Sequence, residues 1–157
     1  MSKSRDIDIE IAIARPVREV YEAWLKPDLL ESWLAYKAIV EPAVGGAYEL
    51  FWDPAATEEN STRGCRITEL VPNSQISFSW KGPVQYAEST ETLTQVFIRL
   101  EPKDGGTLLR FVHTGWGFGP RWEEARLWQE EAWKAAIENL KNLLETTDRY
   151  MENISMN

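Results

Sequence analysis

The chain contains one histidine, His113, and one cysteine, Cys65, the side chains best suited to acid–base or nucleophilic chemistry near neutral pH. His113 has two interpretations: a hydrogen-bonded core residue, or a polar group at a pocket that anchors a ligand or transfers a proton. Cys65 has no base beside it in the sequence and is a weaker candidate for a nucleophile. One His and one Cys leave no recognisable ligand cluster, so we expect no metal site and no cofactor.

Aromatic side chains are the second group of candidates, since the chain holds eight Trp, five Tyr and five Phe. Such side chains fill cores and also line binding surfaces, so their type alone leaves both interpretations open. Those that face inward along predicted strands are suited to line a cavity for a hydrophobic or aromatic small molecule. With His113, the predicted ligand-binding residues are Trp33, Tyr48, Leu50, Trp52, Phe78, Trp80, Phe111, Trp116, Phe118 and Trp133.

Four aromatic residues lie around the start of the last predicted helix. Trp116 and Phe118 alternate with glycines in "GWGFGP", a stretch that suits either a lid over a pocket mouth or a loop tip folded onto the helix start. Trp122 is a candidate to cover the pocket entrance, whereas Trp128 is expected to pack against other residues.

Strands make up most of the elements that must position these residues. Residues 6–13 alternate between isoleucine and mainly acidic residues, which predicts a half-buried strand. Residues 64–80 predict a hairpin that turns at "PN", and residues 91–114 predict another that turns at "KDGG". The polar residues 53–63 and 81–90 are predicted loops. The inward face of the last strand is predicted to carry Thr107, Leu109, Phe111 and His113.

A pair of glycines interrupts this pattern in "VGGAYELFW". Gly45 and Gly46 permit a tight turn or bulge that a residue with a side chain would resist. Tyr48, Leu50 and Trp52 share one face of the strand that follows. We therefore predict that the glycines bend the chain so that these three side chains point inward.

Three helices are predicted. Pro16 suits a first helical position, and the helix that begins there ends before Pro27. A short second helix carries Trp33. Residues 121–147 carry an apolar stripe at helical spacing. A helix of about 25 residues spans roughly 38 Å, which is enough to cross a small sheet.

Length and charge limit the classes of partner. We expect the 157 residues to form one domain, residues 1–157. The net charge of -8 repels polyanions and argues against nucleic acid and anionic membrane as partners. No apolar run approaches the roughly 20 residues of a membrane helix, and the first residues lack the apolar stretch of a secretory signal. With a single cysteine, these features favour a cytoplasmic protein.

Five stretches, taken in order, resemble the START-like (SRPBCC) superfamily of helix-grip folds. Within it, the chain is similar to bacterial proteins related to the C-terminal domain of the activator of heat-shock chaperone ATPase. The stretches are "RPVREVYEAWLKPDLLESWL" (15–34), "VGGAYEL" (44–50), "ITELVPNSQISFSW" (67–80), "GGTLLRFVHTG" (105–115) and "AWKAAIENLKNLLE" (132–145). Their order along nearly the whole chain carries the resemblance, since no single motif is specific.

The resemblance implies an α+β fold with two short helices after the first strand. A curved antiparallel sheet of about six or seven strands would wrap a long C-terminal helix, with a cavity between them that holds an apolar or aromatic molecule in many relatives. We favour a small-molecule binding protein.

Two alternatives remain open at this point. One is an enzyme of polyketide-cyclase or hydrolase type with His113 as acid or base. The other is a co-chaperone-like protein-binding domain. The resemblance implies that eukaryotic activators carry an additional N-terminal domain that contacts the chaperone, whereas here about five residues precede the first predicted strand.

Overall fold

The computed structural model describes residues 5–55, 60–82, 85–86 and 92–155, with side chains described as far as residue 146. The predicted loops at residues 53–63 and 81–90 therefore lie partly outside the described residues. The elements are β1 (Ile7–Ile13), α1 (Val17–Ala23), α2 (Pro27–Trp33), β2 (Lys37–Val40), β3 (Tyr48–Phe51), β4 (Ile67–Val71), β5 (Gln75–Trp80), β6 (Thr94–Lys103), β7 (Gly106–Thr114) and α4 (Pro120–Ser155). This order confirms the predicted α+β class, with two short helices after the first strand.

The described strands form two sheets. Five antiparallel strands in the order β1-β7-β6-β5-β4 make the larger sheet, and β2 pairs with β3 in the smaller one. We predicted one sheet of six or seven strands, and all seven are present, but they are divided. Between β3 and the described chain that leads into β4, the strands do not form a continuous ladder. Two isolated bridges connect them instead, Ala47 with Arg66 and Phe51 with Ser61.

The glycine pair forms the predicted bend between β2 and β3. Gly45 has a φ of 86°, a region that L side chains rarely adopt. A Cβ on Gly46 would lie 2.2 Å from the carbonyl oxygen of Glu41, so the close approach of the backbone excludes a side chain. The backbone of this turn also bonds to β4, since the Gly45 amide donates to the Ile67 carbonyl at 2.8 Å. The bend therefore joins the two sheets.

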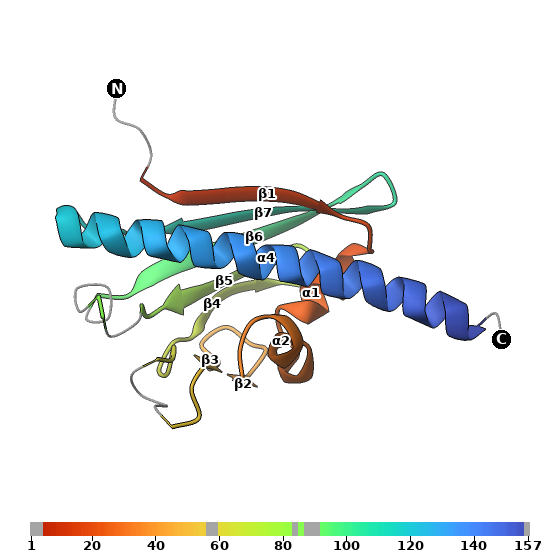
Figure 1. Ribbon diagram of the computed structural model, residues 1–157, viewed down its shortest axis with the longest axis horizontal. Coiled ribbons are helices and arrows are strands. Elements are labelled where there is room, and N and C mark those ends of the chain that lie inside the picture. The colour runs from red at the N-terminus through yellow and green to blue at the C-terminus, as the bar shows by residue number, and fades with distance from the viewer. Residues whose placement is uncertain (1–4, 56–59, 83–84, 87–91, 156–157) are drawn as a thin grey trace.

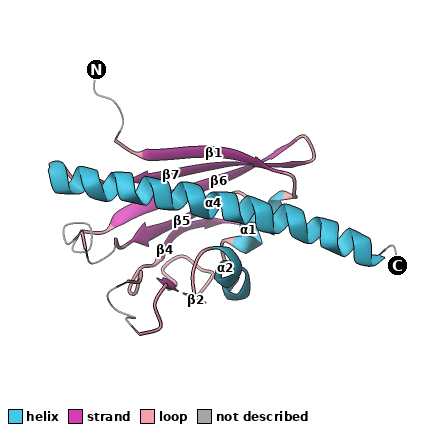
Figure 2. Cartoon of the chain, viewed as in Figure 1, coloured by secondary structure: helices cyan, strands magenta, loops and turns pink. Residues whose placement is uncertain are grey.

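α4 crosses the inner face of the larger sheet, and α1 and α2 lie at one end of it (Figure 1; Figure 2). The helix has 36 residues and is longer than predicted. The reason is that "DRYMENIS" contains neither Gly nor Pro, the residues that commonly end helices. Within the described residues, no helix is both long enough and apolar enough to cross a membrane.

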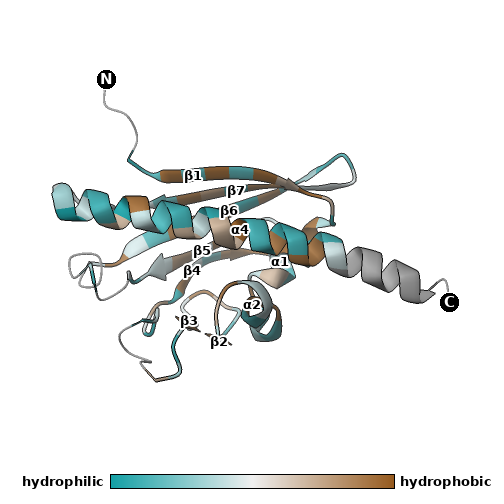
Figure 3. Ribbon diagram, viewed as in Figure 1, coloured by the Kyte–Doolittle hydropathy of each residue, from teal (hydrophilic) through white to brown (hydrophobic). Residues whose placement is uncertain are grey.

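The core lies between α4 and the inner faces of the strands, where hydrophobic and polar residues alternate along β1 (Figure 3). Trp24, at the end of α1, lies at its centre and is fully buried. Its ring centroid is 4.7 Å from that of Trp33, 6.2 Å from Phe111 and 6.1 Å from Trp133. Tyr48 donates its hydroxyl to the Trp24 carbonyl at 2.7 Å. Aromatic residues from both sheets and from α1, α2 and α4 or their ends therefore meet in one cluster.

Candidate functional site

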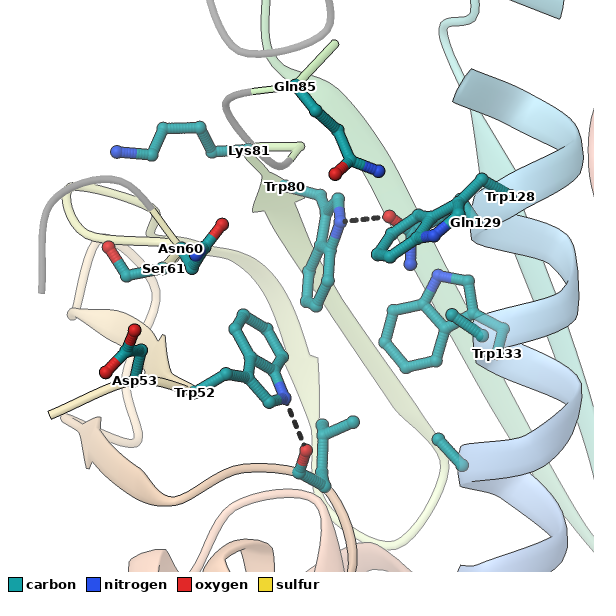
Figure 4. Close-up of a pocket in the computed structure, with 13 residues that line it drawn as sticks. Trp52, Asp53, Asn60, Ser61, Trp80, Lys81, Gln85, Trp128, Gln129 and Trp133 are labelled. Atoms are coloured by element: carbon teal, nitrogen blue, oxygen red, sulfur yellow. Dashed lines mark hydrogen bonds between the residues drawn. The ribbon is translucent and has the colours of Figure 1, made fainter. Parts of the chain in front are cut away.

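A pocket of about 500 Å³ lies between α4 and the segments that follow β3 and β5 (Figure 4). Four of the eight tryptophans line it, together with small residues of α4 and several polar side chains. The described lining residues are Leu34, Trp52, Asp53, Asn60, Ser61, Trp80, Lys81, Gln85, Trp128, Gln129, Ala132, Trp133 and Ala136. Aromatic surface is therefore the dominant feature of the pocket.

The four tryptophans differ in depth. Trp80 and Trp133 are buried, and their ring centroids lie 4.8 Å apart. Trp52 is 39% exposed, and its ring lies edge-on to that of Trp80, with the two ring centroids 5.8 Å apart. Trp128 is 42% exposed on the side of α4. Trp80 and Trp133 thus form the floor of the pocket, while Trp52 and Trp128 stand on opposite sides of its rim.

Hydrogen bonds hold three of these indole rings in place. The Nε1–H of Trp52 donates to the Leu34 carbonyl at 2.6 Å. The Nε1–H of Trp80 donates to Oε1 of Gln129 at 3.2 Å, and that of Trp133 donates to Nδ1 of His113 at 3.0 Å. Because an indole has only this one donor, the three rings present apolar ring surface to the pocket.

Helical spacing brings the α4 side chains to the pocket. Trp128, Ala132 and Ala136 follow one another at intervals of four residues, as do Gln129 and Trp133, so all five lie on one face of the helix. Ala132 and Ala136 are too small to reach across to the strands. Their size leaves the open volume beside Trp133.

His113 lies behind the pocket floor and is fully buried. Since Trp133 can only donate, Nδ1 of His113 must accept, and the proton must lie on Nε2, which is 2.6 Å from Oγ1 of Thr94. Burial lowers the pKa of His113 to about 3, so the ring is neutral at physiological pH. Both ring nitrogens are engaged, and this geometry supports the interpretation as a core residue that positions Trp133.

Cys65 lies in the core beside β4 and does not line the pocket. Burial raises the pKa of its thiol to about 11, against a smaller opposing effect of a hydrogen bond with Ser79. The thiol is therefore protonated near neutral pH, which does not suit a nucleophile.

The predicted ligand-binding residues separate into three groups in the structure. Three of them, Trp52, Trp80 and Trp133, line the pocket. Buried positions that do not line it are held by Trp33, Tyr48, Leu50, Phe78, Phe111, His113 and Trp116. Phe118 is 85% exposed, and the guanidinium of Arg5 lies 4.6 Å from its ring centroid. That any of these residues binds a ligand stays a prediction.

Trp116 and Trp122 pack together rather than on the described pocket. The Trp116 Nε1–H donates to the His113 carbonyl at 3.0 Å. The Trp116 ring lies edge-on to that of Trp122, with the two ring centroids 6.1 Å apart. Of the two roles left open for this loop, the geometry supports packing near the helix start for Trp116.

Sequence reasoning missed most of the pocket wall on α4. Trp128 was expected to pack rather than to line the pocket; its ring centroid lies 6.1 Å from that of Tyr86, but the side chain is 42% exposed and also lines the pocket. The sequence does hold a signal for this wall. Ala132 and Ala136 lie four residues apart beside Trp128 and Trp133, so large and small side chains share one face of the helix and the small ones leave space unfilled. Asp53, Asn60, Ser61, Lys81 and Gln85 come from irregular segments, for which no periodic signal exists.

Among the described residues, no three His, Cys, Asp or Glu side chains gather in a group that could hold a metal ion. In the part of the pocket lining that the structure describes, the polar side chains are three amides, one hydroxyl, one basic residue, Lys81, and one acidic residue, Asp53. The arrangement can supply stacking surface and hydrogen bonds to an enclosed molecule.

Comparison with protein families gives one match that spans the site. Residues 14–145, which include every residue that lines the pocket, match the family described as activator of Hsp90 ATPase homolog 1-like protein. The chain belongs to this family. A search of curated proteins gave no significant match.

Solved structures support the helix-grip fold of the family. Protein MLL2253 from Mesorhizobium loti is 26% identical, with a TM-score of 0.73, and the alignment covers 90% of this chain and 98% of that one. The Aha1 dimer from Colwellia psychrerythraea is 20% identical, with a TM-score of 0.68 and coverage of 89% and 96%. CalU16 from Micromonospora echinospora is also 20% identical, with a TM-score of 0.64 and coverage of 88% and 73%.

Proposed function

We propose that the protein binds a hydrophobic, largely aromatic small molecule in the pocket between α4 and the ends of β3 and β5. The observation that carries the proposal is the gathering of four tryptophans around about 500 Å³ of space. This volume lies in the range of roughly 300–1,000 Å³ that is typical of small-molecule sites. Membership of the family is compatible with this function.

The exposure of the rim supports the proposal. Trp52 and Trp128 leave large apolar surfaces in contact with water. A bound ligand would remove this apolar surface from water, and each Å² covered contributes about 25 cal/mol of favourable free energy to binding. The fixed orientation of Trp52, Trp80 and Trp133 means that little ordering is needed when the ligand enters, which favours binding.

Two alternatives receive less support from the geometry. The enzyme hypothesis relied on His113, which lies behind Trp133 with both ring nitrogens engaged. The co-chaperone hypothesis draws on the description of the family, and stimulation of a chaperone ATPase by the purified protein would favour it over ligand binding.

Native mass spectrometry of the freshly purified protein, followed by a thermal-shift screen of aromatic and lipid-like compounds, tests the proposal. We expect either a stoichiometric adduct of small mass or compounds that raise Tm. A ligand at 100 times its Kd stabilises the folded state by about 2.7 kcal/mol, which is about 5–10 °C for a chain of this size.

Two matched variants show whether the pocket is responsible. Ala132→Leu places a larger side chain in the pocket, and Ala135→Leu makes the same change at an exposed position of α4. We expect the first variant to lose the Tm shift and the second to retain it. No adduct and no Tm shift across a broad library, or equal shifts in the two variants, would contradict the proposal.

A further inference from the structure

We infer that the pocket selects planar aromatic molecules that carry a neutral hydrogen-bond acceptor, such as a ring carbonyl, and that the side-chain amide of Gln129 recognises this acceptor. The inference rests on the proposed function and narrows the class of ligand. It follows from the direction of one amide group, the chemistry of the pocket walls and the balance of charge around them.

The direction of the Gln129 amide is set by Trp80. The indole Nε1–H of Trp80 can only donate, so the atom of Gln129 that lies 3.2 Å from it must be the oxygen. The amide nitrogen is therefore on the other branch of the side chain. Figure 4 shows this nitrogen directed away from the bond with Trp80 and along the pocket toward Trp133.

This nitrogen is available to a ligand. Gln129 is 5% exposed and lines the pocket. Among the described residues, the side chain of Gln129 has a hydrogen bond only with Trp80. Gln129 is not among the described residues whose buried side-chain nitrogen or oxygen lacks a partner, so its nitrogen is open to the pocket, where an acceptor on a ligand can take the place of water. Gln129 thus supplies a directed donor near the floor of the pocket.

The walls favour a flat molecule. Trp52, Trp80 and Trp133 direct their N–H groups to protein acceptors, so they offer ring faces and edges for stacking. Beside Trp133, Ala132 and Ala136 contribute only methyl groups to the α4 wall of the pocket. An aromatic ring system gains from these contacts beyond its buried area, whereas a bulky saturated molecule of the same carbon number does not.

The charges favour a neutral acceptor over an anion. Among the described lining residues there is one basic side chain, Lys81, and one acidic side chain, Asp53, so the formal charges of this part of the lining cancel. The chain as a whole carries a net charge of -8, which repels anions. A carbonyl or ring nitrogen meets the Gln129 donor without this repulsion.

Three compounds with one carbon skeleton separate these requirements. 9-Fluorenone is planar and has one carbonyl, fluorene is planar without it, and perhydrofluorene is saturated. Affinities are measured by quenching of tryptophan emission for the first two compounds and by competition for the third. We expect 9-fluorenone to bind about 3- to 10-fold more tightly than fluorene, the effect of one neutral hydrogen bond, and perhydrofluorene to bind least.

Variants of Gln129 assign the preference to its amide. Gln129→Met keeps a similar volume and removes the donor, and Gln75→Met makes the same change on β5, at a position that does not line the pocket. We expect the ratio of fluorene to 9-fluorenone Kd to fall to about one in Gln129→Met and to stay unchanged in Gln75→Met. The ratio is measured within each variant, so a general loss of stability does not mimic the result.

The outcomes distinguish this inference from the proposed function. If the wild-type protein binds all three compounds equally, or if Gln129→Met retains the preference for 9-fluorenone, the inference is wrong while ligand binding stands. If none of the three binds and the broad screen also finds no ligand, both are wrong.

Discussion

At the scale of single residues, His113 connects the pocket to the core. Its Nδ1 accepts from Trp133, and its Nε2–H donates to Thr94, whose hydroxyl also lies 3.4 Å from the Trp80 carbonyl. The imidazole therefore contacts one floor tryptophan directly and the other through Thr94. A protonated ring would place an N–H against the N–H of Trp133, so the folded state requires the neutral form.

This requirement predicts how stability depends on pH. Burial holds the pKa of His113 at about 3, below its ordinary value of 6.5. Below about pH 6.5 the unfolded chain binds a proton that the folded protein does not, so the free energy of unfolding falls as the pH is lowered toward 3. The full contribution is present above pH 6.5, and the slope is at most about 1.4 kcal/mol per pH unit.

Urea unfolding between pH 7 and 5 measures this slope. His113→Gln is the matched variant, because its amide does not titrate and has both an acceptor for Trp133 and a donor for Thr94. We expect the wild type to lose more stability than the variant over this range. Equal slopes would show that the histidine does not titrate differently on folding.

Cys65 provides a second prediction at this scale. Burial raises the pKa of the thiol from 9.0 to about 11, which lowers the thiolate fraction near pH 8 by about 100-fold. We expect a thiol-reactive disulfide reagent to modify the native protein slowly and the urea-unfolded protein rapidly. A native rate equal to that of a free thiol would mean that Cys65 is accessible.

At the scale of elements, the turn between β2 and β3 determines how the smaller sheet meets the larger one. Gly45 and Gly46 require glycine for different reasons. The first has a φ of 86° with no neighbouring atom within 4 Å of an added Cβ, and the second lacks space because of the Glu41 carbonyl.

These reasons predict different costs for substitution. Gly45→Ala should destabilise by about 1 kcal/mol through backbone strain, and Gly45→Asn by less because Asn tolerates this conformation. Gly46→Ala should cost more, since the backbone must move to relieve the contact with Glu41. Urea unfolding of the three variants gives the order, and equal costs at the two positions would contradict the steric argument.

The sequence predicts the strands better than it predicts the pocket. Thr107, Leu109, Phe111 and His113 alternate with exposed or half-buried residues, apart from Leu108, and all four are buried as expected. Alternation reports which face of a strand is covered, but it does not report whether the covering element leaves space. The space here arises from alanines on α4, and its described polar lining, apart from Gln129 of α4, comes from irregular segments that have no periodicity.

At the scale of the whole molecule, α4 is shared by the core and the pocket. Trp133 illustrates this, because its ring centroid lies 4.6 Å from that of Phe111 in the larger sheet and its side chain also lines the pocket. The opposite wall contains Trp52, which follows β3 of the smaller sheet. A ligand in the pocket would therefore contact both α4 and the segments around the smaller sheet. Without a ligand, the open volume of the pocket separates these two walls.

Bridging predicts a localised change in hydrogen exchange when 9-fluorenone is bound. Amides in residues 128–136 of α4 and in residues 80–82 should exchange more slowly, because local opening of either wall would then require loss of the ligand contacts. β1 and the half of β7 nearest Gly106 do not line the pocket, so their amides serve as the internal control and should change only as far as global stability rises. Exchange measured with and without ligand, in the wild type and in Ala132→Leu, checks the prediction. Slowing confined to the outer face of the sheet, or equal slowing in Ala132→Leu, would place the binding site elsewhere.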